Sequence, residues 1–281
     1  MLQRSYGLTF AGLPAVDELD PHVDPADLVV DVRVGPADEE PPEEPLGATG
    51  GTRRLADGRL LSLDRGRSTA AFFGPPLTPD LLAHPYLGPV ATAFSRWQGR
   101  EAFHAGAFVL GGRAWAVSGP RTAGKSTLLA ALAARGTPVL SDDIVVTDGT
   151  VVFAGPRCVD LREAPPFPDL DLSPARRGER LRLRLPAAPD RLPLGGWLFL
   201  SWADEPALEP VPSRTALGVL TARRSAGHLT SDPQVLLALA TLPAWRFLRP
   251  RRFDAVEETL DLLDRTLGPA AAAAPSPVRR R

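Results

Sequence analysis

Three residue types are almost missing from this 281-residue sequence: Lys125 is its one lysine, Ile144 is its one isoleucine, and asparagine does not occur. All three are encoded by AT-rich codons, so the composition indicates a GC-rich genome, and we expect a bacterial source. Under that bias nearly every positive charge is written as arginine. A position that still carries lysine is a candidate for chemistry that arginine cannot perform. The lysine ammonium is a compact charge on a slim side chain, whereas the arginine guanidinium is broad and planar.

Cysteine, long apolar runs and net charge are also scarce. Cys158 is the only cysteine, which excludes an intrachain disulfide. The longest apolar stretches, such as 196–200, are too short to cross a bilayer, and residues 1–20 contain no apolar core of a secretory signal. The formal net charge of −1 provides no basic field for nucleic acid or an anionic membrane. These absences predict a cytoplasmic protein that binds neither.

The residues that are present suit an ordinary globular fold, with 44% hydrophobic and 23% charged residues. We expect a small N-terminal α+β region over 1–98, a nucleotide-binding domain over 99–268 and a disordered tail over 269–281. The patterns of the N-terminal region predict a strand at 28–34, a solvated loop at 36–51, and a helix at 81–97 that Pro85 and Pro89 break.

Apolar runs between turn signals predict the elements of the second part. Two hairpins are expected, 103–110 with 113–118 and 144–147 with 150–154, because Gly-Gly and Asp-Gly pairs separate their strands. Further strands are predicted at 139–140, 197–202 and 245–248, and helices at 125–135, 233–242 and 254–267.

The most specific motif is GPRTAGKST at 119–127. Gly119, Gly124, Lys125 and Ser126 fill the pattern G-x-x-x-x-G-K-[ST], whose glycines let backbone N–H groups converge on phosphate oxygens. Lys125 would reach the β- and γ-phosphates, Ser126 would ligate Mg²⁺, and Thr127 would lie near the α-phosphate. The loop is completed by Pro120, Arg121, Thr122 and Ala123. A chance match is the alternative, but the strand and helix predicted on either side are the context that the motif requires.

Three polar side chains flank this loop in the predicted fold. Asp142 and Asp143 end the strand after the helix, an edge that lies beside the phosphate loop in such folds. Their side chains should point to opposite sides, so one is a candidate magnesium ligand and the other a candidate general base. An ordinary Asp-Asp turn is the alternative. His104 begins the strand that leads into the first hairpin, and by itself it is as well explained by a structural hydrogen bond.

Together these residues resemble the catalytic domain of HPr kinase/phosphorylase and the related group of HPr-kinase-like proteins. The shared order is a His with a small residue, the phosphate loop, a helix ending in Arg-Gly, and an Asp-Asp pair. Here these are His104-Ala105, GPRTAGKST, Arg135-Gly136 and Asp142-Asp143, within a match over 103–147. The resemblance implies an α/β P-loop nucleotide-binding domain of HPr-kinase type, a mixed sheet flanked by helices, and a homo-oligomer.

The resemblance also implies roles for matching residues. It implies that Asp143 is the proton acceptor, that His104 and Lys125 are active-site groups, and that Ser126 is a magnesium ligand. Glu163 is the candidate for the family's downstream metal-binding glutamate. The segment 210–217 is similar to its substrate-side arginine loop, which makes Arg214 a candidate. This sequence departs from the family at Thr127, where the family has glutamate.

We therefore expect a kinase that uses ATP and Mg²⁺ to phosphorylate a hydroxyl, most simply a serine of a protein or peptide. Asp142 and Ser126 would organise the metal ion. Whether HPr itself is the acceptor stays open, because the region before His104 is short. Two alternatives also stay open: a nucleotide-dependent regulatory or binding ATPase without phosphotransfer, and a small-molecule kinase on the same scaffold.

Overall fold

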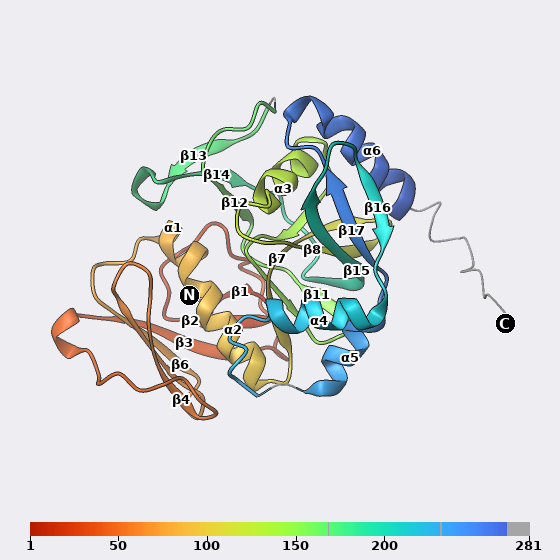
Figure 1. Cartoon of the computed structure of the whole chain (residues 1–281). Helices are drawn as coiled ribbons and strands as arrows, with labels where there is room; N and C mark the ends of the chain where they lie inside the picture. Colours follow the sequence, from red (N-terminus) through yellow and green to blue (C-terminus); the bar gives the residue numbers. More distant parts are fainter. Residues whose placement is uncertain (168, 231, 269–281) are drawn as a thin grey trace.

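The computed structural model describes residues 1–167, 169–230 and 232–268, and within them the chain forms three β-sheets with covering helices (Figure 1). The mixed α/β class expected from the sequence is confirmed. The tail predicted over 269–281 lies outside the described residues. Among the helices that are described, none is long and apolar enough to cross a membrane.

A six-stranded sheet forms the N-terminal region, in the order β1-β2-β3-β6-β5-β4. Its strands are β1 (Gln3–Ser5), β2 (Leu8–Ala11), β3 (Leu28–Gly35), β4 (Gly50–Arg54), β5 (Leu60–Asp64) and β6 (Thr69–Phe73). The strand predicted at 28–34 is confirmed as β3, and no residue of the predicted loop 36–51 is buried. The five strands that the pattern did not predict are three to five residues long, too short for a periodic signal.

A broken helix packs on this sheet. It consists of α1 (Pro79–Leu81), a π-helical turn over 82–86 and α2 (Leu87–Trp97). The break predicted at Pro85 is confirmed, because the backbone leaves helical geometry at His84. The break predicted at Pro89 is wrong. Pro89 lies in the first turn of α2, where its missing N–H leaves no helical hydrogen bond unmade.

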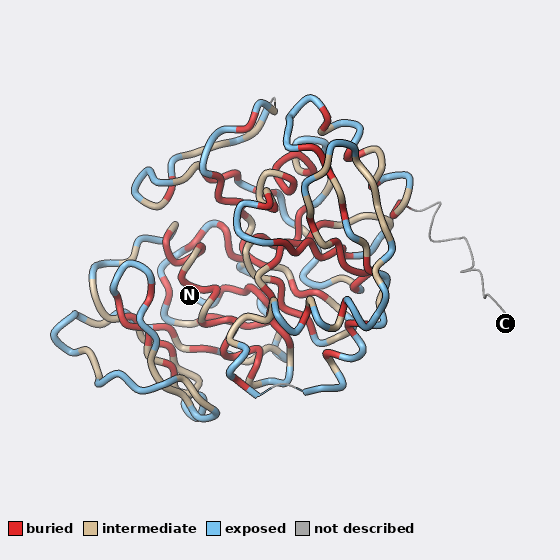
Figure 2. The backbone as a smooth tube through the Cα atoms, viewed as in Figure 1, coloured by how far each residue is buried: buried red, intermediate tan, exposed pale blue. Residues whose placement is uncertain are grey.

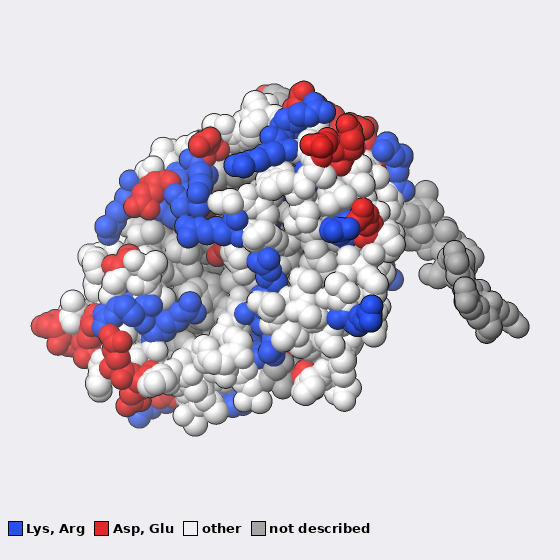
Figure 3. All heavy atoms as spheres, in the orientation of Figure 1, with Lys and Arg blue, Asp and Glu red and all other residues white. Residues whose placement is uncertain are grey.

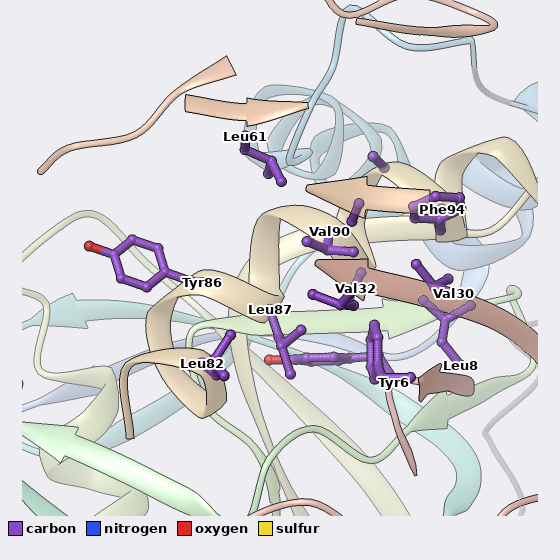
Figure 4. Close-up of a cluster of buried hydrophobic side chains, with 14 of the residues drawn as sticks. Tyr6, Leu8, Val30, Val32, Leu61, Leu82, Tyr86, Leu87, Val90 and Phe94 are labelled. Atoms are coloured by element: carbon purple, nitrogen blue, oxygen red, sulfur yellow. The ribbon is translucent and has the colours of Figure 1, made fainter. Parts of the chain in front are cut away.

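The space between this helix and the sheet is filled by apolar side chains. Figure 4 shows Leu87, Val90 and Phe94 of α2 close to Val30 and Val32 of β3. The same cluster continues into the next sheet through Ala102, Val146 and Phe153. The N-terminal region therefore shares part of its core with the rest of the chain, and the division at residue 98 stays a prediction.

The second sheet has eight strands, in the order β11-β10-β7-β8-β15-β17-β16, with β9 beside β7. They are β7 (Glu101–Leu110), β8 (Arg113–Ser118), β9 (Val139–Ser141), β10 (Ile144–Thr147), β11 (Val151–Phe153), β15 (Arg191–Trp202), β16 (Ala207–Pro210) and β17 (Ala244–Arg249). Both predicted hairpins are confirmed. Strands β8, β15 and β17 are parallel, so their carboxyl ends meet at one edge, where ligands bind in α/β sheets.

Helices cover both faces of this sheet (Figure 1). They are α3 (Lys125–Ala134) and α6 (Val256–Leu267) on one face and α4 (Ser213–Arg223) and α5 (Pro233–Thr241) on the other. Alternation along β8 explains the two faces, because Trp115 and Val117 join the core under α3 and α6 whereas Ala114 and Ala116 join the other. Figure 2 shows the buried stretches following these central strands and α3. The three predicted helices are confirmed, but α4 was not predicted.

A third sheet packs beside α3, in the order β12-β14-β13. Its strands are β12 (Cys158–Leu161), β13 (Leu172–Ala175) and β14 (Arg180–Arg184). Arg182 of β14 is buried and donates to both carboxylate oxygens of Asp160, at 2.7 and 3.0 Å. It also donates to Glu18 at 2.9 Å and to the carbonyl oxygen of His84 at 3.1 Å. One cation thus joins this sheet to the N-terminal region.

Replacing Arg182 with methionine should destabilise the protein by about 2–3 kcal/mol, because it removes the bidentate partner of the buried Asp160 carboxylate and leaves that carboxylate with Arg176, 2.6 Å away. The measurement is the free energy of unfolding from urea titration. Arg184→Met is the matched control, because Arg184 lies on the same strand but is exposed, and it should change the stability by less than about 0.5 kcal/mol. Equal effects of the two substitutions would show that the buried network contributes nothing of its own.

Candidate active site

The glycine-rich loop connects β8 to α3. Its backbone turns through a left-handed angle at Gly124, where φ is 74°, a conformation that glycine adopts without strain. A Cβ on Gly124 would lie 2.8 Å from the guanidinium of Arg249, and one on Gly119 would lie 3.0 Å from the Cβ of Ala123. A side chain at either glycine would therefore have to displace a packed neighbour, and at Gly124 it would also strain the left-handed backbone. The loop ends at the N-terminus of α3, where N–H groups without helical acceptors suit an anion.

Lys125 begins α3 and is only 8% exposed. Its Nζ donates to the carbonyl oxygens of Gly119 at 3.1 Å and Pro120 at 3.5 Å, so the ammonium lies within the curl of the loop. Burial lowers the pKa of Lys125, and the charges of Asp142 and Asp143 oppose that shift. A compact cation in this position can exchange its carbonyl partners for phosphate oxygens.

The next residue, Ser126, contacts the first aspartate of the pair. Its hydroxyl donates to the carboxylate oxygens of Asp142 at 3.1 and 3.2 Å. Asp142 is 5% exposed. Burial, together with the negative charge of Asp143, raises the pKa of Asp142 to about 7. A carboxylate in this position has a strong tendency to take up a proton or a cation.

The Ser126 and Asp142 oxygens suit Mg²⁺. Magnesium in phosphate sites is held by one or two protein oxygen ligands together with phosphates, not by a complete protein cage. The described residues contain no cluster of three His, Cys, Asp or Glu side chains arranged around a metal position. The hydroxyl and the buried carboxylate beside the loop supply two hard oxygen donors, so the residues present fit the ion.

Asp143 faces the other way. The pair forms the bend between β9 and β10, which both pair with β7, and Asp143 adopts a left-handed φ of 68° there. Nδ1 of His104 on β7 lies 3.0 Å from the Asp143 carboxylate and 3.0 Å from its carbonyl oxygen. Both partners accept, so Nδ1 carries the proton. Burial would raise the pKa of Asp143, but the His104 hydrogen bond and the nearby His84 outweigh it and lower the pKa to about 2.

These groups line one cleft of about 880 Å³. One wall is the loop and the start of α3, a second is the three-stranded sheet, and a third comes from the ends of β15 and β17. Six arginines border it: Arg121, Arg162, Arg176, Arg180, Arg251 and Arg252. Figure 3 shows Lys and Arg side chains gathered over the part of the molecule where Figure 1 has β13 and β14 and toward the start of α6, whereas Asp and Glu side chains lie over α6 itself. The cleft is therefore suited to an anionic ligand.

The structure brings together most of the site residues that the sequence predicted. Those that line the cleft are His104, Arg121, Thr122, Gly124, Lys125, Ser126, Thr127, Asp142, Asp143 and Glu163. Gly119, Pro120 and Ala123 shape the loop behind them. Glu163 is exposed two residues beyond β12, and no hydrogen bond in the described part joins it to Asp142 or Ser126. Glu163 as a metal ligand therefore stays a prediction.

Arg214 is the predicted residue that the structure leaves out of the cleft. The segment 210–217 was expected to be a loop, but α4 begins at Ser213, so that expectation is wrong from this residue onward. Arg214 lies exposed in the first turn of α4 and is not among the cleft residues. The other end of the same helix carries Arg223, whose positive charge lowers the pKa of Lys125.

Sequence reasoning missed several cleft or loop residues, among them His84, Asp160, Trp202 and Arg249. His84 is buried beside Asp143, and Asp160 is the partner of Arg182. Arg249 is 7% exposed and donates to the carbonyl oxygen of Ala123 in the loop. For Asp160 and Arg249, the sequence signal that could have indicated a site residue was a charged residue within an apolar run, as in CVDL at 158–161 and WRFLR at 245–249.

Comparisons with known proteins add little to this geometry. No protein-family model and no curated protein matches the chain. Among solved structures it is similar to the HPr(Ser) kinase/phosphatase of Coxiella burnetii, with 13% sequence identity and a TM-score of 0.33. That likeness covers 59% of this chain and 95% of the other. It is too weak to carry an argument, so the function is argued from the site itself.

Proposed function

We propose that the chain is a magnesium-dependent kinase that transfers the γ-phosphoryl group of ATP to a hydroxyl, with a serine of a protein or peptide as the acceptor. The observation that carries the proposal is that two adjacent aspartates contact different partners in the cleft. Asp142 contacts Ser126 next to the loop, whereas Asp143 contacts His104 on the neighbouring strand. A kinase of this kind needs a metal-binding carboxylate and a second carboxylate for the attacking hydroxyl, and this pair offers a candidate for each in one cleft.

Each group has a defined task in this proposal. The loop amides and Lys125 bind the β- and γ-phosphates, and Ser126 and Asp142 hold the magnesium ion. When bound, that ion neutralises charge on the phosphate oxygens. The acceptor oxygen forms a bond to the γ-phosphorus as the bond to the β,γ-bridging oxygen breaks.

The acceptor's proton passes to a carboxylate oxygen of Asp143. His104 donates to the same carboxylate and fixes its orientation. A base with a pKa of about 2 is weak, but it is adequate here, because the transition state of phosphoryl transfer is loose and the aspartate mainly positions the hydroxyl. Catalysis would come chiefly from positioning and electrostatics.

The test is label transfer. Incubated with γ-labelled ATP, Mg²⁺ and lysate from its source, the protein should place acid-stable label on a protein or peptide. α-Labelled ATP should label nothing, and EDTA should abolish the transfer. Tight ATP binding without any labelled acceptor would favour the regulatory ATPase. Label on a small metabolite alone would favour the small-molecule kinase.

A further inference from the structure

Trp202 is an exposed aromatic side chain at the edge of the phosphate loop. It is the last residue of β15, and its register partner on the parallel strand β17 is Arg249. Residues in register on neighbouring strands share a face of the sheet, so the two side chains lie together beyond its carboxyl edge. The Arg249 guanidinium carbon lies 4.3 Å from the centroid of the Trp202 ring.

One face and one edge of the Trp202 ring are fixed by these neighbours. Arg249 covers the face and also donates to the carbonyl oxygen of Ala123 in the loop. Gly124 borders the edge, because a Cβ there would lie 3.2 Å from Cη2 and 3.4 Å from Cζ2 of the ring. The indole is therefore in contact with the loop that would bind the phosphates, through Arg249 on one face and Gly124 at one edge.

Part of the indole is open, although the Arg251 guanidinium carbon also lies 5.9 Å from the ring centroid. Trp202 is 41% exposed and lines the same cleft as Lys125 and Ser126. Among the large hydrophobic side chains that are exposed in the described residues, Trp202 and Phe253 are the aromatic ones, and both line this cleft. Phe253 already has an edge-to-face partner in Phe167, with ring centroids 5.9 Å apart. Trp202 has an aromatic surface without such a partner among the described rings.

The order of the strands indicates which part of a bound nucleotide would lie next to Trp202. Strand β8, which leads into the loop, lies between β7 and β15. His104 and Asp143 are on the β7 side, so the acceptor hydroxyl would approach from there. In-line transfer requires the leaving nucleoside diphosphate on the opposite side of the γ-phosphorus. That direction leads to β15 and Trp202.

We propose that the exposed part of the Trp202 ring stacks on the base of the bound nucleotide, with the Arg251 side chain moving aside to admit it. This inference rests on the proposed function, because it takes the phosphates to lie on the loop. Stacking on an aromatic ring is tolerant of base identity, since every base has a π-face. The site should therefore bind ATP and GTP with similar affinity, and it should bind both more tightly than the triphosphate group alone.

Calorimetry with the full chain can separate the base from the phosphates. Trp202→Ala should raise the Kd for Mg-ATP about tenfold but change the Kd for Mg-tripolyphosphate by less than about twofold, because stacking contributes only to nucleotide binding. Trp202→Phe keeps a flat ring and should retain most of the ATP affinity. Phe253→Ala, the rival platform in the same cleft, should have little effect.

Two results would overturn the inference while leaving the proposed function intact. One is an unchanged Kd for ATP in Trp202→Ala. The other is an equal loss for ATP and tripolyphosphate, which would mean that the ring only supports the loop. A wild-type protein that binds neither ligand would instead refute the phosphate site, and with it both proposals.

Discussion

Replacing Lys125 with alanine is expected to raise the Kd for Mg-ATP by about a hundredfold or more. The ammonium lies inside the loop, 3.1 Å from the carbonyl oxygen of Gly119, where it would meet the β- and γ-phosphates directly. Burial has already lowered its pKa, which means that much of its hydration is lost before the ligand arrives. The measurement is isothermal titration calorimetry, with circular dichroism to show that the fold is kept.

The variant Lys125→Arg tests whether binding needs the shape of the lysine side chain as well as its charge. It retains the charge but replaces a slim stem by a planar fork in a position that is only 8% exposed, so we expect it not to restore binding. The matched control is Arg113→Ala, which removes an exposed charge from the opposite end of β8 and should leave the Kd within about twofold. Unchanged ATP binding in Lys125→Ala would refute the phosphate loop and everything argued from it.

The sequence predicted the parts of the site whose neighbours are close in the chain. The loop follows β8 and precedes α3 directly, and the Asp pair comes a few residues after that helix, so pattern and turn residues were sufficient. His104 was placed correctly because β7 and β8 form a hairpin. Such local signals can be read from sequence because they depend on the backbone preferences of the residues themselves and not on distant contacts.

The parts that sequence patterns missed depend on pairing between distant segments. Arg182 contacts Glu18 across 164 positions, and Arg249 contacts Ala123 across 126. No periodicity in either segment indicates the other. The difference at 213–217, where a family resemblance suggested a loop, has another cause. Pro212 is the residue before α4, where proline disrupts no helical hydrogen bond, so the two prolines of PVPSRTAL do not prevent a helix.

Replacing Asp143 with asparagine is expected to lower the turnover number about a hundredfold, the low end of the contribution of a general base, because Asp143 mainly positions the hydroxyl. Asparagine keeps the shape of the side chain, and its amide oxygen can still accept from Nδ1 of His104, 3.0 Å away in the wild type. It cannot take the acceptor's proton. The Kd for Mg-ATP should stay within about threefold, because the substitution removes a negative charge that contacts no phosphate in the proposed complex.

Asp142→Asn is the informative comparison, because it makes the same change one residue away. Asp142 contacts Ser126 at 3.1 Å and would hold magnesium, so this variant should lose the magnesium dependence of ATP binding as well as turnover. Single-turnover transfer and calorimetry with and without Mg²⁺ therefore distinguish the two aspartates. Transfer at the wild-type rate by Asp143→Asn would remove it as the proton acceptor. If the two variants changed turnover and magnesium-dependent ATP binding equally, the separate roles of Asp142 and Asp143, on which the kinase proposal rests, would be contradicted.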